Sequence, residues 1–190
     1  MELPLREILF TPGEDANFGI FAISEVLNPA IQEDWVYFSN NKVNLEIQNE
    51  EQRIVFGAIL IPGMKVYRDV NGVEFNLTID AKNIENAVVD FFANNRTKNV
   101  NQNHTDELVD GFTFFQSVIT NDLIPFVKGF EHLPIGTAFL GAKVTDDAKW
   151  QEIKDGKFKG WSIHAKFNQV PVVDYSKELD ELTKSLFLSL

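Results

Sequence analysis

The sequence has no cysteine, only three histidines and no long apolar run. The absence of cysteine excludes disulfides, thiolate metal sites and a cysteine nucleophile, and it fits a reducing compartment. The most apolar stretch, residues 54–64, is interrupted by glycine and proline and is much shorter than the roughly 20 residues of a spanning helix. The N-terminus lacks a basic segment followed by an apolar one, which is the pattern of a signal peptide. We therefore expect a soluble, cytoplasmic protein with no membrane partner.

Basic residues are also few, with 17 Lys and Arg against 28 Asp and Glu, so the net charge is −11. A chain this acidic repels phosphate groups, and we expect no nucleic-acid partner and no attraction to an anionic membrane. The hydrophobic content of 44% is that of a globular protein. A length of 190 residues fits one domain, which we place at residues 1–174, followed by a C-terminal helix or tail at residues 175–190.

The hydrophobic pattern indicates an α+β fold dominated by short strands. Alternating apolar residues predict a strand at 73–79, and Asn71-Gly72 predicts a tight turn that joins it to a strand at 65–70. Helical spacing predicts a helix at 81–94 with Asp80 as its N-cap. The remaining expected elements are strands at 112–119, 136–144 and 158–167, a loop at 120–134, and helices that begin after Thr145 or Asp146 and at residue 175. So many short strands indicate a small closed or nearly closed barrel.

The strand at 158–167 is the most informative for chemistry. Its alternation places Trp161, Ile163 and Phe167 toward the core, and Ser162 and His164 on the opposite face. A serine held on a rigid strand, facing outward or into a shallow groove, is well placed to act as a nucleophile on a large substrate. A polar residue on the solvent side of a strand is the simpler interpretation of the same pattern.

Other chemistry has little support in the sequence. No phosphate-binding loop is present, and the segment Gly-Trp-Ser-Ile-His lacks the second glycine of a nucleophile elbow. His104, His132 and His164 do not have zinc-ligand spacing. We therefore predict no metal and no cofactor.

Five blocks occur in an order that resembles the phage prohead maturation proteases, in particular their XkdF-type branch. The blocks are GIFAISEVLNPAIQEDWVYFS, VFGAILIPGMKVYRDVNGVEFNLTI, the helix at 81–94, NVNQNHTDELVDGFTF and LPIGTAFLGAKVTDDAKWQEIKDGKFKGWSIHAKF. They cover roughly residues 19–168. This branch looks like a relative of the herpesvirus assemblins, so the resemblance implies a compact, mostly antiparallel β-barrel wrapped by a few helices.

The resemblance also implies an activity and its residues. It implies a serine endopeptidase with Ser162 as nucleophile and His104 as general base. Relatives use an acidic residue or a second histidine as the third member; Asp174 is our first choice and His164 our second. Gln116 stands where relatives lead us to expect an acidic residue.

The implied partners are capsid and scaffold proteins as substrates, together with the protease itself. Because assemblin-like enzymes dimerise through helices, we expect a homodimer or higher self-association. The implied location is the host cell cytoplasm, inside the assembling procapsid.

Three alternatives remain open from the sequence. Gln116 and the uncertain third residue are compatible with a catalytically decayed capsid-assembly or scaffold protein of the same fold. The 17 phenylalanines are compatible with a barrel that binds a small molecule, although aromatic residues more often form core. The three histidines are compatible with a metal-dependent hydrolase.

Overall fold

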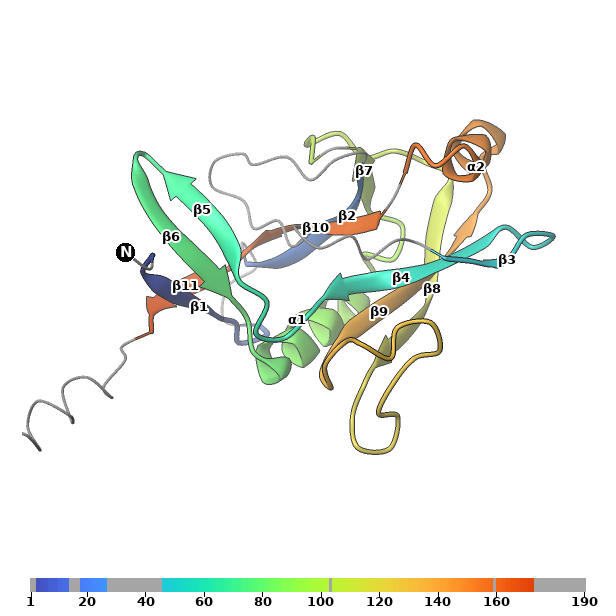
Figure 1. Ribbon diagram of the computed structural model, residues 1–190. Coiled ribbons are helices and arrows are strands. Elements are labelled where there is room, and N and C mark those ends of the chain that lie inside the picture. Colours follow the sequence, from blue (N-terminus) through green and yellow to red (C-terminus); the bar gives the residue numbers. More distant parts are fainter. Residues whose placement is uncertain (1–2, 14–17, 27–45, 103, 159, 173–190) are drawn as a thin grey trace, which may run out of the picture.

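The computed structural model describes residues 3–13, 18–26, 46–102, 104–158 and 160–172, and these form a mixed α+β structure (Figure 1). Its elements, in chain order, are β1 (Leu5–Leu9), β2 (Gly19–Val26), β3 (Glu46–Asn49), β4 (Ile54–Leu60), β5 (Val66–Val70), β6 (Val73–Thr78), α1 (Ala81–Ala93), β7 (Val100–Gln102), β8 (Phe112–Ile119), β9 (Ala138–Val144), α2 (Asp147–Lys154), β10 (Gly160–Lys166) and β11 (Asn168–Pro171). The predicted α+β class is confirmed. No helix among the described residues is long and apolar enough to cross a membrane.

The strands form three sheets, with the orders β11-β1-β6-β5, β10-β2-β7 and β3-β4-β9-β8. Strands β1 and β6, and strands β2 and β7, pair in parallel, whereas the other pairs are antiparallel as predicted. None of these sheets closes on itself within the described residues, so the predicted barrel is not found there. Alternation in a sequence reports which face of a strand is buried, but strand order and closure depend on long-range pairing.

The elements predicted from local signals are confirmed closely. Strands β5 and β6 pair antiparallel around Asn71 and Gly72, both of which have positive φ angles of 53° and 79°. Positive φ at both central residues is the geometry that makes Asn-Gly a preferred hairpin turn. The Asp80 side chain caps α1 by accepting a hydrogen bond from the backbone N–H of Asn83, and Asp146 caps α2 in the same way through Lys149.

One strand was not predicted, and one predicted helix lies outside the described residues. Strand β11, which pairs with β1, was not predicted because its four residues include two amides and a proline and all are exposed, so they show no apolar alternation. The helix predicted at residues 175–188 lies outside the described residues, as does Asp174. The boundary predicted at residue 174 therefore stays a prediction.

The aromatic residues form core packing. The main cluster lies between the sheets and α1 and contains Phe91, Phe114 and Trp161. The Phe114 ring packs edge-on against both of the other rings, and its centroid lies 5.1 Å from that of Trp161. A second cluster lies around Phe130 and Phe139, whose rings pack at 5.2 Å. The phenylalanine content is thus largely explained by ring-to-ring contacts in the interior, which weakens the sequence argument for a ligand-binding barrel.

Strand β2 occupies a central position. It lies between β10 and β7 in its sheet, α1 packs against it, and β10 also contacts β4 of the neighbouring sheet (Figure 1). Ile20, Ile23, Ser24 and Glu25 are all fully buried, which means that both faces of the strand are covered. A polar residue on such a strand has no access to water and must find its partners within the protein.

Candidate active site

The polar face of the sheet β10-β2-β7 carries one residue from each strand in a row. Ser162 on β10 is the direct partner of Ser24 on β2, and Ser24 is the direct partner of Asn101 on β7. Residues paired across neighbouring strands project to the same face, with Cβ atoms of antiparallel pairs about 4.5–5.5 Å apart. The register therefore brings three polar side chains from distant parts of the sequence together.

Ser162 lies in this row with a fully buried side chain. The predicted alternation of β10 is correct, since Trp161, Ile163 and Ala165 enter the main core. The expectation that the Ser162 face is outward or a shallow groove is wrong, because the exposure of Ser162 is 0% and that of His164 is 5%. The Ser162 Oγ has no hydrogen-bond partner among the described residues. An unpartnered buried hydroxyl costs free energy, so Ser162 is a candidate for a functional role.

His104 follows β7 directly and reaches the same row. Its Nδ1 lies 2.9 Å from the Oγ of Ser24, 80 residues earlier in the chain. Its backbone has φ +60°, a left-handed conformation that is uncommon for residues other than glycine and that histidine, asparagine and aspartate adopt more often than the rest. Backbone strain of this kind is often found where a side chain is held for function.

His164 is joined to the row from the other side. Its Nδ1 lies 2.6 Å from the Nδ2 of Asn101, and the Oγ of Ser24 donates a 2.5 Å hydrogen bond to the Oδ1 of Asn101. Its Nε2 lies 4.0 Å from the Oδ1 of the exposed Asp106. The rings of His104 and His164 are 6.5 Å apart between centroids. The two histidines are thus connected through one serine and one asparagine.

The surroundings favour neutral histidines. Desolvation by burial, followed by the positive charges of His164 and Arg68, lowers the pKa of His104 to about 3. Desolvation also lowers the pKa of His164, while Asp106 and a hydrogen bond with the Thr105 backbone partly oppose this change. At neutral pH both rings are therefore uncharged, which is the state that a general base requires.

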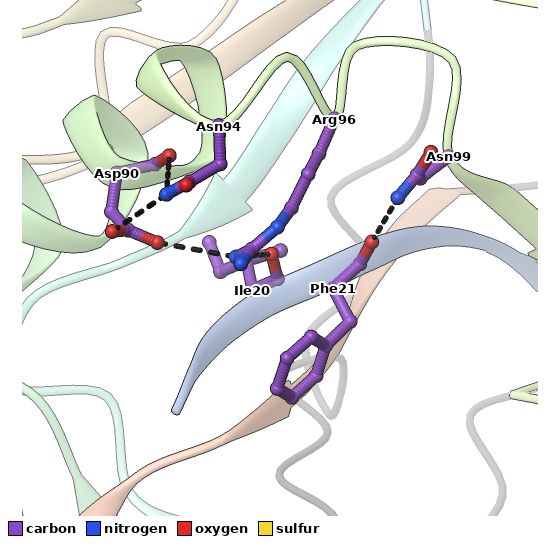
Figure 2. Close-up of polar contacts among 6 residues, drawn as sticks. All are labelled: Ile20, Phe21, Asp90, Asn94, Arg96 and Asn99. Carbon is purple, nitrogen blue, oxygen red and sulfur yellow. Dashed lines mark hydrogen bonds and ion pairs between the residues drawn. The ribbon is translucent and has the colours of Figure 1, made fainter. Parts of the chain in front are cut away.

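A second polar network fixes β2 against the segment that leads to β7 (Figure 2). The Nη1 of Arg96 donates a 2.8 Å hydrogen bond to the carbonyl of Ile20 and lies 3.2 Å from the Oδ2 of Asp90 at the end of α1. The Nδ2 of Asn99 donates a 2.9 Å hydrogen bond to the carbonyl of Phe21. These contacts hold the strand that carries Ser24 and the turn that precedes Asn101 in a fixed relation.

The remaining residues singled out in the sequence lie apart from this cluster. Gln116 is on β8, in a different sheet, where its side chain occupies the space beside Gly141. His132 is exposed in the loop between β8 and β9. Within the described part of the chain, no group of three or more histidine and acidic residues is arranged to hold a metal.

Ser24 and Asn101 were not predicted from the sequence. The available signal was a serine followed by a glutamate inside the apolar strand GIFAISEV, since polar residues on a doubly buried strand need internal partners. Asn101 lies in the same NVNQNHT block as His104, but nothing in the sequence distinguishes it from the asparagines beside it. Both residues become recognisable only once the register of the three strands is known.

The chain matches one known protein family. Residues 42–170 match the family model described as "Putative phage serine protease XkdF". No curated protein and no solved structure is significantly similar to the chain. The match covers more than half of the 190 residues, including His104, Ser162 and His164 but not Ser24. The chain therefore belongs to the XkdF family of phage serine proteases.

Proposed function

We propose that the protein is a serine endopeptidase of the prohead maturation type, which cleaves scaffold and capsid precursor proteins, and itself, inside the assembling procapsid. The family supports a protease, and the residues at the sheet β10-β2-β7 support the chemistry. The observation that carries the proposal is the direct pairing of Ser162 with Ser24, whose hydroxyl lies 2.9 Å from His104. A serine and a neutral histidine are thereby held in one buried site.

In the proposed mechanism Ser162 is the nucleophile and His104 is the general base. The Oγ of Ser162 attacks the scissile carbonyl while His104 accepts the hydroxyl proton, and the tetrahedral intermediate collapses when His104 returns that proton to the leaving amine. Water then attacks the acyl-enzyme with the same proton transfers and releases the new carboxyl terminus. Ser162 fits the nucleophile better than Ser24, because the Ser24 hydroxyl already donates to Asn101.

The burial of Ser162 has a consequence for this mechanism. A hydroxyl with 0% exposure is reached by a peptide only after neighbouring groups move away. We therefore propose that the site is closed in the isolated chain and opens when a capsid or scaffold partner binds, as segments that cover an active site do in other enzymes.

The test is co-expression with the cognate capsid and scaffold proteins, with wild type compared with Ser162→Ala and Ser24→Ala, and with all products read by intact-mass spectrometry. We expect trimmed partners with the wild type and full-length partners with Ser162→Ala. The loss of a triad member typically lowers the rate by about 10⁴ to 10⁶-fold.

Each outcome of this experiment is decisive. Trimming at the wild-type rate by Ser162→Ala would overturn the assignment of the nucleophile. The absence of trimming by a folded wild type, under conditions in which the shell assembles, would favour the alternative of a non-enzymatic capsid-assembly protein. A serine-directed fluorophosphonate added to the trimming reaction identifies the nucleophile directly, since peptides containing Ser162 and Ser24 differ in mass.

A further inference from the structure

The hydrogen bonds that connect the two histidines have a direction that the donor and acceptor groups determine. An asparagine side chain has an oxygen that only accepts and a nitrogen that only donates, a hydroxyl does both, and a neutral imidazole has one of each. Fixing one proton in such a run therefore fixes all the others. Here the run is His104, Ser24, Asn101 and His164.

The charge of the exposed Asp106 carboxylate, together with a hydrogen bond with the Thr105 backbone, favours a proton on His164. The carboxylate lies 4.0 Å from the Nε2 of His164, and a carboxylate favours a proton on the nearest ring nitrogen. The Nδ1 of a neutral His164 then accepts, so that the Nδ2 of Asn101 donates to it at 2.6 Å. The reverse orientation of the amide would place a ring lone pair toward Asp106, which is electrostatically unfavourable.

The rest of the order follows from this orientation. With its Nδ2 toward His164, Asn101 presents Oδ1 to Ser24, and the Ser24 hydroxyl donates to it at 2.5 Å. Ser24 has only one proton, so its Oγ accepts from the Nδ1 of His104 at 2.9 Å. His104 therefore carries its single proton on Nδ1, and its Nε2 has the lone pair that a general base uses.

We propose that Ser24 and Asn101 are positioning residues for the His104 base: an ordered run of hydrogen bonds that starts at His164 holds His104 in the tautomer with the proton on Nδ1. The role that a carboxylate has in many serine proteases is then filled by a serine, which is itself oriented by an amide. Neither residue touches the reacting bond. This inference rests on the proposed function, because it assigns its residues to the base of that reaction.

The burial of the run supports this assignment. Ser24 is fully buried and Asn101 is 1% exposed, so water does not compete for their hydrogen bonds. In a dry site, a run of hydrogen bonds is stronger and its partners are less exchangeable than at the surface. The charged groups that act on the histidines are Arg68, which disfavours protonation of His104, and Asp106, which favours a proton on His164.

The test reads the histidine tautomers by long-range proton–nitrogen NMR on the ¹⁵N-labelled full chain, with the three ring signals assigned from single histidine substitutions. In the wild type we expect the proton on Nδ1 of His104 and on Nε2 of His164. In Asn101→Leu the Ser24 hydroxyl loses its acceptor and turns to donate to His104, so the proton of His104 moves to Nε2. This shift is informative because the hydrogen bonds join Asn101 to His104 through the Ser24 hydroxyl.

Three further variants complete the test. Asn101→Asp, which accepts on both sides, should move the proton of His164 to Nδ1 and leave His104 unchanged. In Ser24→Ala, His104 should no longer favour the tautomer with its proton on Nδ1, and Ser24→Thr should restore this tautomer. The matched control is Ser117→Ala, an exposed serine on β8, which should leave both tautomers and the cleavage rate as in the wild type.

Cleavage of the cognate scaffold protein is measured on the same variants. An incorrect tautomer of the base should lower kcat by about 10² to 10⁴-fold, with KM little changed. A cleaving wild type whose His104 tautomer does not respond to Ser24→Ala or Asn101→Leu would overturn this inference and leave the protease assignment standing. A wild type with the expected tautomers that cleaves nothing would overturn both the protease and the positioning role, and would leave only a structural hydrogen-bond network.

Discussion

The hydroxyl of Ser162 is buried without a hydrogen-bond partner among the described residues, whereas the hydroxyl of Ser24, its neighbour across the sheet, has two. The two serines are equally inaccessible, and each has an exposure of 0%. Their difference in bonding implies a difference in what each contributes to stability, because an unsatisfied buried polar group costs free energy and a satisfied one does not.

We predict opposite changes in stability when either serine is replaced by alanine. Ser162→Ala removes an unpartnered hydroxyl and should raise the free energy of unfolding by about 1 kcal/mol, although it abolishes cleavage. Ser24→Ala leaves the Asn101 oxygen and the His104 ring nitrogen without the Ser24 hydroxyl, and it should lower the free energy of unfolding by about 1–3 kcal/mol. Urea denaturation measures both, with exposed Ser117→Ala as the control. A clear loss of stability in Ser162→Ala would contradict the assignment of Ser162 as an unpartnered group.

The histidines predict how stability depends on pH. The pKa of His104, about 3 in the folded protein, is below the value of roughly 6.5 in the unfolded chain, so the unfolded state binds more protons between these values. Stability should therefore be full above pH 7 and should fall as the pH decreases below about 6.5. The slope should be at most about 1.4 kcal/mol per pH unit for each histidine that contributes. His164, whose pKa is also lowered, adds in the same direction.

Urea denaturation from pH 8 to pH 4.5 measures this slope. His104→Asn is the comparison, because asparagine tolerates the left-handed backbone and does not titrate. The variant should show a shallower decline than the wild type over this range. Equal slopes in the two proteins would show that His104 is not held neutral by its surroundings.

At the scale of elements, the site depends on how α1 and the following turn hold β2. Arg96 and Asp90 form an ion pair with side-chain exposures of 16% and 10%, and Arg96 also bonds the carbonyl of Ile20 (Figure 2). Gly19 lies beside this pair, where an added Cβ would come within 2.9 Å of the Asp90 Oδ2. The geometry of β2, and with it the position of Ser24, is thus set by contacts outside the site.

Removing one member of this pair should be costly. Asp90→Ala leaves a largely buried guanidinium without its counter-charge, and we expect a loss of about 3–5 kcal/mol in the free energy of unfolding. Asp90→Ala combined with Arg96→Met should lose less than Asp90→Ala alone, because the unpaired charge is gone. Lys82→Ala is the control, since it breaks the exposed Lys82–Glu85 pair on the same helix and should change stability by less than about 1 kcal/mol. Similar losses in Asp90→Ala and Lys82→Ala would contradict the importance of this contact.

At the scale of the whole molecule, the net charge of −11 opposes contact between copies of the chain. Self-association is expected from the resemblance to dimerising proteases, so the two tendencies compete. Added salt weakens the repulsion between copies, because the screening length falls from about 10 Å at 0.1 M to about 3 Å at 1 M.

We predict that the self-associated fraction increases with salt. Sedimentation velocity of the full chain at about 0.1 M and 1 M salt, at several protein concentrations, measures the distribution of species. A neutral solute at matched density is the control for hydrodynamic effects. A single species of 21.6 kDa under all of these conditions would contradict self-association.

Local signals in the sequence determined several of the elements, whereas the two proposed site residues came from the family resemblance. The Asn71-Gly72 turn, the Asp80 cap and the alternation of β10 were readable because each depends on residues that are near one another in the chain. Ser162 and His104 were found through the family resemblance, and the family is confirmed over residues 42–170. Their catalytic roles remain proposals.

Only the tertiary structure decided that the sheets stay separate, that the face of Ser162 is buried, and that Ser24 and Asn101 join the two histidines. These features depend on the pairing of β10, β2 and β7, whose contacting residues are separated by 63 to 80 positions in the hydrogen bonds of the site. A strand's own sequence reports which of its faces is apolar, but not which strand lies beside it or what covers its polar face. Long-range register, which is the sum of many weak contacts, places the serine and the asparagine between the histidines.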